Sequence, residues 1–345
     1  MHPIRPSRWS HLPGMPAPLR RATLLASVLL WAGSALAADR IVMNLGWSTP
    51  ADSSYSVPAK KFKELAEKYT NGAVEVKLRC CAQIATEDDA FKAMQLGTVD
   101  AYFISQNNVS PHWPLMDVFV LPYIFQSEAH VTKVTTGPVG ETIRKQLLAD
   151  SGVHLLTFGA PSYRDLFNSR QPVNSLADMK GLKLRVPKNK VMIATFQAFG
   201  AEPVPLAWSE TPTALQTKTI DGADNGTSVI KDMKFYEFSK HLVILDHFAG
   251  VAPMFASDRM MKKLGAEHGA AIRRAAVEAG AYHTEVQTKE TAEVRQWLVE
   301  KGGMKMTSPP RAPFIAAAQK VQQQFATEGG PKFTELVNLI QAAAK

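Results

Sequence analysis

Cysteine is scarce in this sequence. Of its 345 residues only two are cysteine, and they are neighbours, Cys80 and Cys81. A disulfide between adjacent residues would close only a small, strained ring, so the chain cannot gain stability from a long covalent loop. A redox role would call for a better-shaped thiol pair such as C-x-x-C, which is absent. We therefore interpret the two cysteines as small residues that follow a strand.

The sequence also lacks the local signatures of most enzymes. It contains no G-x-G-x-x-G, no phosphate-binding loop, no G-x-S-x-G and no H-E-x-x-H. Its nine histidines form no spaced pair with cysteines or carboxylates that would indicate zinc. No cofactor or metal is therefore predicted, and the chain is not expected to be an enzyme. A catalytic triad assembled by the fold stays open, because its members need not be close in sequence.

An excess of basic residues is present but small. Lysine and arginine number 39 against 31 acidic residues, yet four of the arginines lie within residues 1–37, which contain no acid. The remainder has 35 basic and 31 acidic residues, and no basic block is interleaved with aromatics. No nucleic-acid partner is therefore predicted.

The first residues read as an export signal. Arg20 and Arg21 precede an apolar run over residues 22–32, and the small triplet Ala35-Leu36-Ala37 follows. The run is short for a membrane span, and no later segment approaches 18 uncharged apolar residues. We expect a cleaved signal peptide over residues 1–37 and a soluble periplasmic protein that starts at Ala38. We favour export by the general secretory route over the twin-arginine route. Met15 is an alternative start site of translation.

The N-terminal half alternates strands and helices. Strands are expected over residues 41–47, 74–78, 99–104 and 153–158, and helices over residues 58–69, 86–97 and about 141–148. This alternation predicts an α/β domain with a largely parallel sheet.

A second alternating region begins near Ser162. Strands are expected over residues 182–186, 242–245 and 252–255, and helices over 190–199 and 209–217. Residues 267–301 contain no proline and predict a helix long enough to cross two lobes. Residues 93–101 and 214–222 resemble each other, each with a helix end, a turn, a short strand and an acid, which favours two lobes of similar design.

Arg185 is the most informative polar residue. It lies at the carboxyl end of a predicted strand, where open α/β sheets place their ligands, and its planar fork of donors matches a carboxylate. Arg164 follows an earlier strand, and either arginine can instead form an ion pair within the protein. Asn225 offers both a donor and an acceptor. Trp208 and Trp47 can line a pocket or pack in the core.

A family resemblance adds to this picture. The central segment, residues 174–187, reads NSLADMKGLKLRVP and is similar to the signature of the solute-binding subunits of TRAP transporters, of the dicarboxylate-binding type. The resemblance continues in order through residues 200–205, 214–216 and 221–225, and in the N-terminal half through residues 70–72, 83–84 and 121–125. It covers essentially all of residues 40–345.

The resemblance implies a two-lobed periplasmic binding protein with a long helix that spans both lobes. Lobe 1 would comprise residues 38–161 and about 251–290, and lobe 2 residues 162–250 and about 291–345. In the family pattern the arginine of the L-R-V-P stretch, here Arg185, pairs with the substrate carboxylate. The other ligand-binding residues implied are Arg164, Asn225 and Trp208 from the second lobe, with Trp47 and Gln106 expected from the first.

The resemblance implies a monomeric binding protein that closes on a small organic acid and delivers it to the membrane permease subunits of a TRAP transporter. Departures from the family pattern at Ile84-Ala85, Thr211-Pro212 and Gly226-Thr227 lie near the predicted cleft or hinge and leave the choice of carboxylate open. Two alternatives also stay open. One is a secreted hydrolase or lyase that acts on an organic acid, and the other is a binding protein that serves a sensor kinase.

Overall fold

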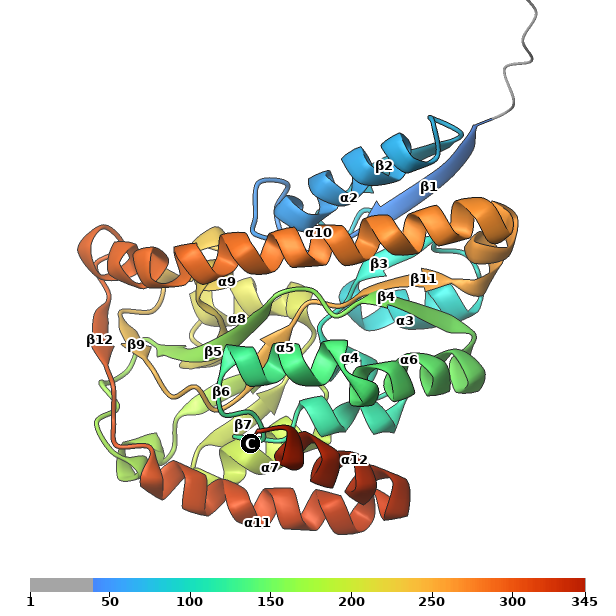
Figure 1. Cartoon of the computed structure of the whole chain (residues 1–345). Helices are drawn as coiled ribbons and strands as arrows, with labels where there is room; N and C mark the ends of the chain where they lie inside the picture. Colours follow the sequence, from blue (N-terminus) through green and yellow to red (C-terminus); the bar gives the residue numbers. More distant parts are fainter. Residues whose placement is uncertain (1–39, 345) are drawn as a thin grey trace, which may run out of the picture. The chain divides into compact units, whose positions relative to one another are not determined.

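The computed structural model describes residues 40–344 (Figure 1). The predicted signal peptide, its cleavage after Ala37 and the alternative start at Met15 lie outside the described residues. The described part contains two β-sheets with helices packed around them, so the predicted α/β class is confirmed. Within residues 40–344 no helix has the length and apolar character needed to cross a membrane.

The first sheet has five strands in the order β2-β1-β3-β11-β4. The strands are β1 (Ile41–Gly46), β2 (Val74–Arg79), β3 (Ala101–Phe103), β4 (Val153–Thr157) and β11 (Met254–Ser257). β1 pairs in parallel with β2 and β3, whereas β11 runs antiparallel to β3 and β4. The expectation of a largely parallel sheet is wrong at β11, because this strand enters from the second sheet and so runs in the opposite direction.

Several helices follow the strands of the first sheet. They are α2 (Ser56–Tyr69), α3 (Glu87–Gln95), α4 (Gln106–Val109), the 3-10 helix η1 (Pro114–Phe119), α5 (Glu128–Thr136) and α6 (Pro138–Ser151). Local sequence explains where they begin. At α3 the side chain of Thr86 accepts a hydrogen bond from the backbone N–H of Asp89, and three acidic residues occupy the first turn. This cap matters for function because Glu87, in that first turn, lines the cleft described below.

The second sheet has seven strands. They are β5 (Pro161–Asn168), β6 (Lys183–Val186), β7 (Glu202–Pro205), β8 (Gly222–Gly226), β9 (His241–Val243), β10 (Ala249–Val251) and β12 (Lys305–Thr307). β6 lies parallel between β7 and β8, and β5 runs antiparallel to β8, β9 and β10. This sheet is therefore also mixed. The chain passes from the first sheet to the second through residues 158–160 and returns through residues 252–253.

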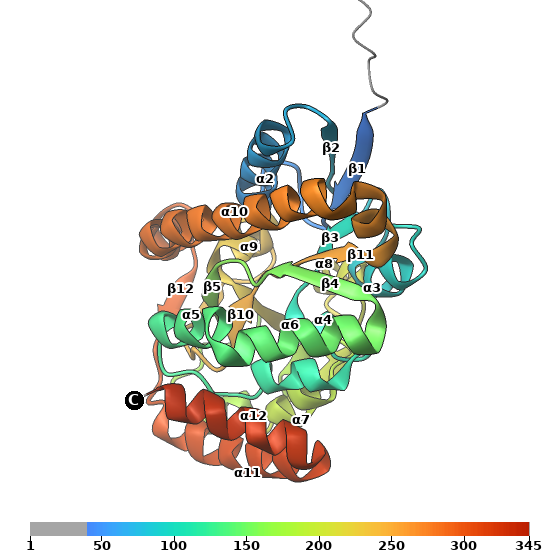
Figure 2. The same ribbon diagram turned by 45° about the vertical axis from the view of Figure 1, so that its right-hand side comes forward.

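Helices around the second sheet are mostly short. They are η2 (Leu176–Met179), α7 (Lys190–Ala198), η3 (Trp208–Glu210), α8 (Thr211–Gln216), α9 (Thr227–Asp232) and η4 (Phe235–Glu237). After β12 the chain ends in α11 (Ala312–Glu328) and α12 (Gly330–Ala343). α11 packs on α7, and α12 packs on α5 and α6 (Figure 2). The C-terminal helices thus contact elements from both halves of the chain, and the lobe boundaries stay a prediction.

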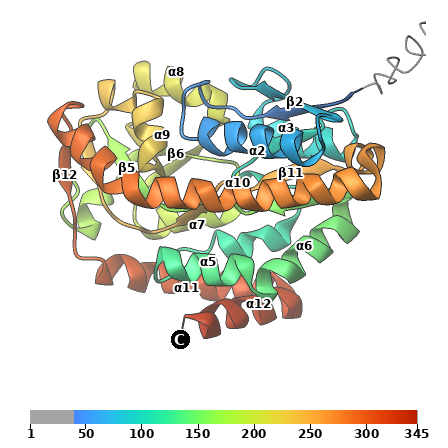
Figure 3. The ribbon, with the colours of Figure 1, turned by 45° about the horizontal axis from the view of Figure 1, so that its top comes forward.

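The predicted long helix is present as α10 (Asp258–Glu300), which lies alongside α2 (Figure 3). Gly265 adopts a left-handed φ of 70° that interrupts the first turns, so the uninterrupted part begins after it. Ile272 and Ala276 belong to the apolar core that includes Met43 of the first sheet. Leu298 belongs to a different core, with Phe167 of the second sheet. One helix therefore contributes to the cores beneath both sheets.

The two segments predicted to repeat have the same local structure. In each, a helix ends, a residue adopts a left-handed φ and an aspartate precedes the next strand. Oδ2 of Asp100 accepts a hydrogen bond from the backbone N–H of Asn44 at 2.9 Å, and Oδ2 of Asp221 accepts one from that of Lys183 at 2.8 Å. In each sheet the aspartate thus forms a hydrogen bond between its own strand, β3 or β8, and the parallel neighbour, β1 or β6.

Cys80 and Cys81 are joined by a disulfide. The expectation that they act simply as two small residues is therefore wrong. Cys81 and Ala82 both have a left-handed φ, and the backbone N–H of Gln83 donates to the carbonyl of Cys80. The bond joins two residues of one tight turn after β2.

Candidate functional site

A cleft between the second sheet and segments that follow strands of the first sheet contains most of the predicted site residues. It has two adjoining parts that share Tyr55, Ser105, Arg164, Asn225 and Val229. The part that we call the arginine end also includes Thr49, Glu87, Asn107, Asn108, Arg185 and Trp208. The part that we call the helix end also includes Ser54, Gln106, Ser162, Ser228 and, from α10, His283 and Gln287.

Strand order in the second sheet explains why the predicted residues meet. Arg185 is in β6, and its neighbour β8 runs parallel to it and carries Asn225. The carboxyl ends of parallel strands lie at the same edge of a sheet, which is where ligands bind in open α/β folds. β5 then places Arg164 opposite Gly226 of β8. Arg185, Arg164 and Asn225 line one cleft together with Trp208, and their role in binding a ligand stays a prediction.

Arg185 is a buried cation without an acidic partner. Its side chain is 3% exposed, and Nε and Nη2 both donate to the carbonyl of Leu206, at 3.0 and 2.8 Å. Among the described residues, no carboxylate lies within ion-pair distance of it. Burial, followed by the charge of Arg164, lowers the pKa of Arg185 to about 10, so it remains protonated at neutral pH. The charges of Asp224, Glu87 and Asp88 oppose this shift, but none of these carboxylates bonds to the guanidinium. A buried cation without a bonded counter-ion favours binding of an anion.

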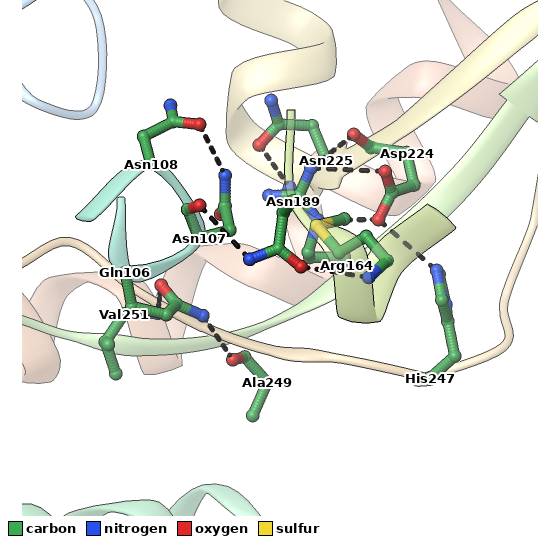
Figure 4. Close-up of polar contacts among 12 residues, drawn as sticks. Gln106, Asn107, Asn108, Arg164, Asn189, Asp224, Asn225, His247, Ala249 and Val251 are labelled. Carbon is green, nitrogen blue, oxygen red and sulfur yellow. Dashed lines mark hydrogen bonds and ion pairs between the residues drawn. The ribbon is translucent and has the colours of Figure 1, made fainter. Parts of the chain in front are cut away.

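Arg164 is in a different electrostatic situation, because it is already paired. Nε lies 2.6 Å from Oδ2 of Asp224, and Nη2 donates to Oδ1 and to the carbonyl of the same residue (Figure 4). The buried His247 has Nε2 3.3 Å from Oδ2 as well. Burial would raise the pKa of Asp224, but Arg164 and His247 outweigh it and hold that pKa below its usual range. Asp224 thus largely neutralises Arg164.

Another wall of the arginine end comes from segments that follow strands of the first sheet, and it contains Glu87 of α3. Its Oε1 accepts a hydrogen bond of 2.6 Å from the backbone N–H of Ser105. Burial raises the pKa of Glu87, and hydrogen bonds from Ser105 and Asn108 oppose that shift. The hydroxyl groups of Tyr55 and Ser105 are 3.4 Å apart. This wall is therefore polar and carries hydroxyl, amide and carboxyl groups.

The two residues expected from the first lobe have different outcomes. Gln106 does line the helix end, but its amide is already engaged. Nε2 donates to the carbonyl of Ala249 at 2.9 Å, and Oε1 accepts from the N–H of Val251 at 3.2 Å (Figure 4). Trp47 does not reach the cleft. It is 2% exposed in the core around the first sheet, and its indole N–H donates to the carbonyl of Pro50.

The sequence does not predict several residues that line the cleft or lie behind its lining. Asp224 stands directly before Asn225, but its partner Arg164 is 60 residues away on a strand that was not predicted. Glu87 lies at the start of the helix predicted over residues 86–97, and nothing in the sequence places it at the cleft. His283 and Gln287 lie inside a long uniform helix, and no local signal distinguishes them from its other polar residues.

Comparison with known proteins identifies the family. Residues 45–328 match the family model described as bacterial extracellular solute-binding protein, family 7. This chain belongs to that family. Among its relatives is the 2,3-diketo-L-gulonate-binding periplasmic protein of Escherichia coli K12, 28% identical over 92% of this chain and 96% of the relative. The C4-dicarboxylate-binding periplasmic protein of Rhodobacter capsulatus is 30% identical over 89% of this chain and 92% of its own length.

Solved structures of TRAP periplasmic solute-binding proteins share the fold. A TRAP periplasmic solute-binding protein from Polaromonas sp. JS666, bound to D-erythronate, superposes with a TM-score of 0.84 at 29% identity and covers 88% of this chain and 99% of its own. A counterpart from Xanthobacter autotrophicus Py2, with bound β-D-galacturonate, has a TM-score of 0.81 at 27% identity, with 87% and 99% covered. The predicted two-lobed fold with a long helix is thereby confirmed, as is the resemblance to TRAP solute-binding subunits.

Proposed function

We propose that this family 7 protein captures a sugar acid in the periplasm and delivers it to the permease of a TRAP transporter. The observation that carries the proposal is Arg185, a buried guanidinium without a carboxylate partner among the described residues. Its fork of donors matches the two oxygens of a ligand carboxylate. The relatives support this class of ligand, because two solved members hold erythronate and galacturonate, each with one carboxylate and several hydroxyl groups.

The pairing of Arg164 with Asp224 favours an acid with a single carboxylate. A second carboxylate of the ligand would have to compete with Asp224, which is already bonded to Arg164 through both of its carboxyl oxygens. The choice of carboxylate, which the sequence leaves open, is thereby narrowed to acids with one carboxylate. Trp208 and Asn225 would then border the ligand, and residues from both sheets would favour a closed state by differential affinity.

Export by a signal peptide over residues 1–37, a monomeric state and the absence of catalysis are parts of the same proposal. Relatives described as periplasmic binding proteins support the location. Binding proteins of this kind release their ligand unchanged, so the incubated acid should be recovered intact.

The test is a thermal-shift screen of purified protein followed by titration calorimetry. Specific ligands raise the unfolding midpoint by mass action. D-Erythronate, D-gluconate and D-galacturonate should raise the midpoint, and succinate and malate should raise it less. If none of these acids shifts the midpoint, or if the acid is consumed during incubation, the proposal is wrong.

A further inference from the structure

The helix end of the cleft contains a buried side chain without a polar partner. His283 of α10 lines this end and is 4% exposed. Neither Nδ1 nor Nε2 has a hydrogen-bond partner among the described residues. Buried polar atoms are hydrogen-bonded in the great majority of cases, because a buried atom left unsatisfied loses its bonds to water without replacement. A ligand group that bonded to this imidazole would remove that penalty.

The imidazole of His283 is suited to a neutral ligand group. Burial lowers the pKa of His283 to about 4, so the ring is neutral at neutral pH. A neutral imidazole has one nitrogen that donates and one that accepts. A hydroxyl group also donates and accepts, whereas a carboxylate only accepts. His283 therefore matches a hydroxyl better than a second carboxylate.

The surroundings of His283 have the same uncharged polar character. Gln287 lies one turn further along α10, on the same face, and also lines the helix end. Three serines complete the polar lining, Ser54, Ser162 and Ser228. The charged side chain at this end is Arg164, and its charge is compensated by the ion pair with Asp224. Nothing at the helix end offers an unpaired cation to a second carboxylate.

We infer that His283 and Gln287 form a subsite for the hydroxyl groups of the bound acid furthest from its carboxylate, so that α10 helps to select the ligand. The inference rests on the proposed function, with the ligand carboxylate at Arg185 and its hydroxylated end toward α10. It makes His283 a residue that selects hydroxylated monocarboxylic acids over dicarboxylic and unsubstituted acids. The helix that contributes to both cores is then also part of the binding site.

The experiment combines protein variants with a modified ligand. Titration calorimetry is performed with the best-bound of D-erythronate, D-gluconate and D-galacturonate, and with its analogue that lacks the hydroxyl furthest from the carboxylate. The variants are His283→Phe, which removes both polar atoms, and His283→Gln, which keeps an uncharged donor and acceptor. His268→Phe is the matched control, because His268 is on the same helix and lines neither part of the cleft.

The inference predicts that His283→Phe weakens binding of the hydroxylated acid roughly 10-fold and leaves the affinity for the deoxy analogue nearly unchanged. His283→Gln should retain much of the affinity, and His268→Phe all of it. If His283→Phe binds both acids as the wild type does, or weakens both equally, the inference is overturned while the proposed function stands. If the wild-type protein binds none of the acids, both are wrong.

Discussion

The guanidinium of Arg185 lies over the ring of Trp208, 5.5 Å from its centre. Two nitrogens of the same guanidinium donate to Leu206, two residues before that tryptophan. One short segment therefore fixes both the position and the plane of the cation. Nε and one hydrogen of Nη2 are used by Leu206, which leaves Nη1 and the other hydrogen of Nη2 side by side for the two oxygens of a carboxylate.

Replacement of Arg185 should abolish ligand binding while the fold is kept. Loss of one partner of a buried ion pair costs about 3–5 kcal/mol, which is roughly 10²–10³-fold or more in affinity. Arg185→Lys should fail as well, because an ammonium is a point charge without the fork. Titration calorimetry with the best-bound sugar acid measures the effect, with Arg170→Lys at an exposed site as the control. Affinity near that of the wild type in Arg185→Ala would contradict the assignment.

Asp224→Asn should destabilise the protein strongly at neutral pH. Asp224 is buried, and loss of its charge leaves Arg164 uncompensated, at a cost of about 3–5 kcal/mol in the free energy of unfolding. Because the folded-state pKa of Asp224 is lowered, its stabilisation is present above its unfolded pKa and is lost as the pH falls. Urea unfolding at several pH values should show a weaker acid dependence in the variant. Glu285→Gln, at an exposed ion pair with Lys289, is the control and should change the free energy of unfolding little.

His283 should make the protein less stable in mild acid. Its pKa is lowered to about 4 in the folded state, so between pH 6.5 and about 4 the unfolded chain binds a proton that the folded chain does not. The contribution of His283 to stability should be constant above this window and fall within it by at most about 1.4 kcal/mol per pH unit. Denaturant unfolding from pH 7.5 to 4.5 should give a shallower decline for His283→Gln than for the wild type. Parallel curves for the two proteins would show that burial does not keep this histidine neutral.

The Cys80–Cys81 disulfide should contribute little to global stability. It joins adjacent residues, so it removes little chain entropy from the unfolded state. Thiol assays of the denatured, unreduced protein should find no free thiol. The variant in which both cysteines are serine should unfold at nearly the same denaturant concentration as the wild type. A large loss of stability would mean that the turn after β2 depends on the bond for its conformation.

How far the sequence predicts the site depends on the strand that carries each residue. The alternation of Leu182, Leu184 and Val186 predicts β6, and with it the position of Arg185 at the ligand-binding edge. The strand β5 was not predicted, since only three residues separate it from β4. The ion pair between Arg164 and Asp224 could therefore not be anticipated, although both residues lie in or near segments that the sequence singles out.

Whether a given side chain lines the cleft or lies in the core depends on its burial in the folded protein. Trp47 and Trp208 are both large aromatic residues near predicted strand or helix ends, and periodicity gives no reason to separate them. Packing places Trp47 in the core of the first sheet and Trp208 at the cleft. For His283 the sequence predicts the helix but not the surroundings of the side chain. It lies in a helix that was predicted well, but its environment depends on which face of that helix meets the cleft, and the sequence alone does not specify this.

The position of β11 has a consequence for the folding of a chain that crosses a membrane N-terminus first. This strand lies between β3 and β4, yet it follows β4 in the sequence only after the whole of β5 to β10. A chain that emerges from a membrane pore with its N-terminus first cannot complete the first sheet until Met254–Ser257 has passed through. Until then β3 and β4 have unpaired edges. If the chain is exported as proposed, the first sheet of the emerged part would therefore stay incomplete until most of the polypeptide has crossed the membrane.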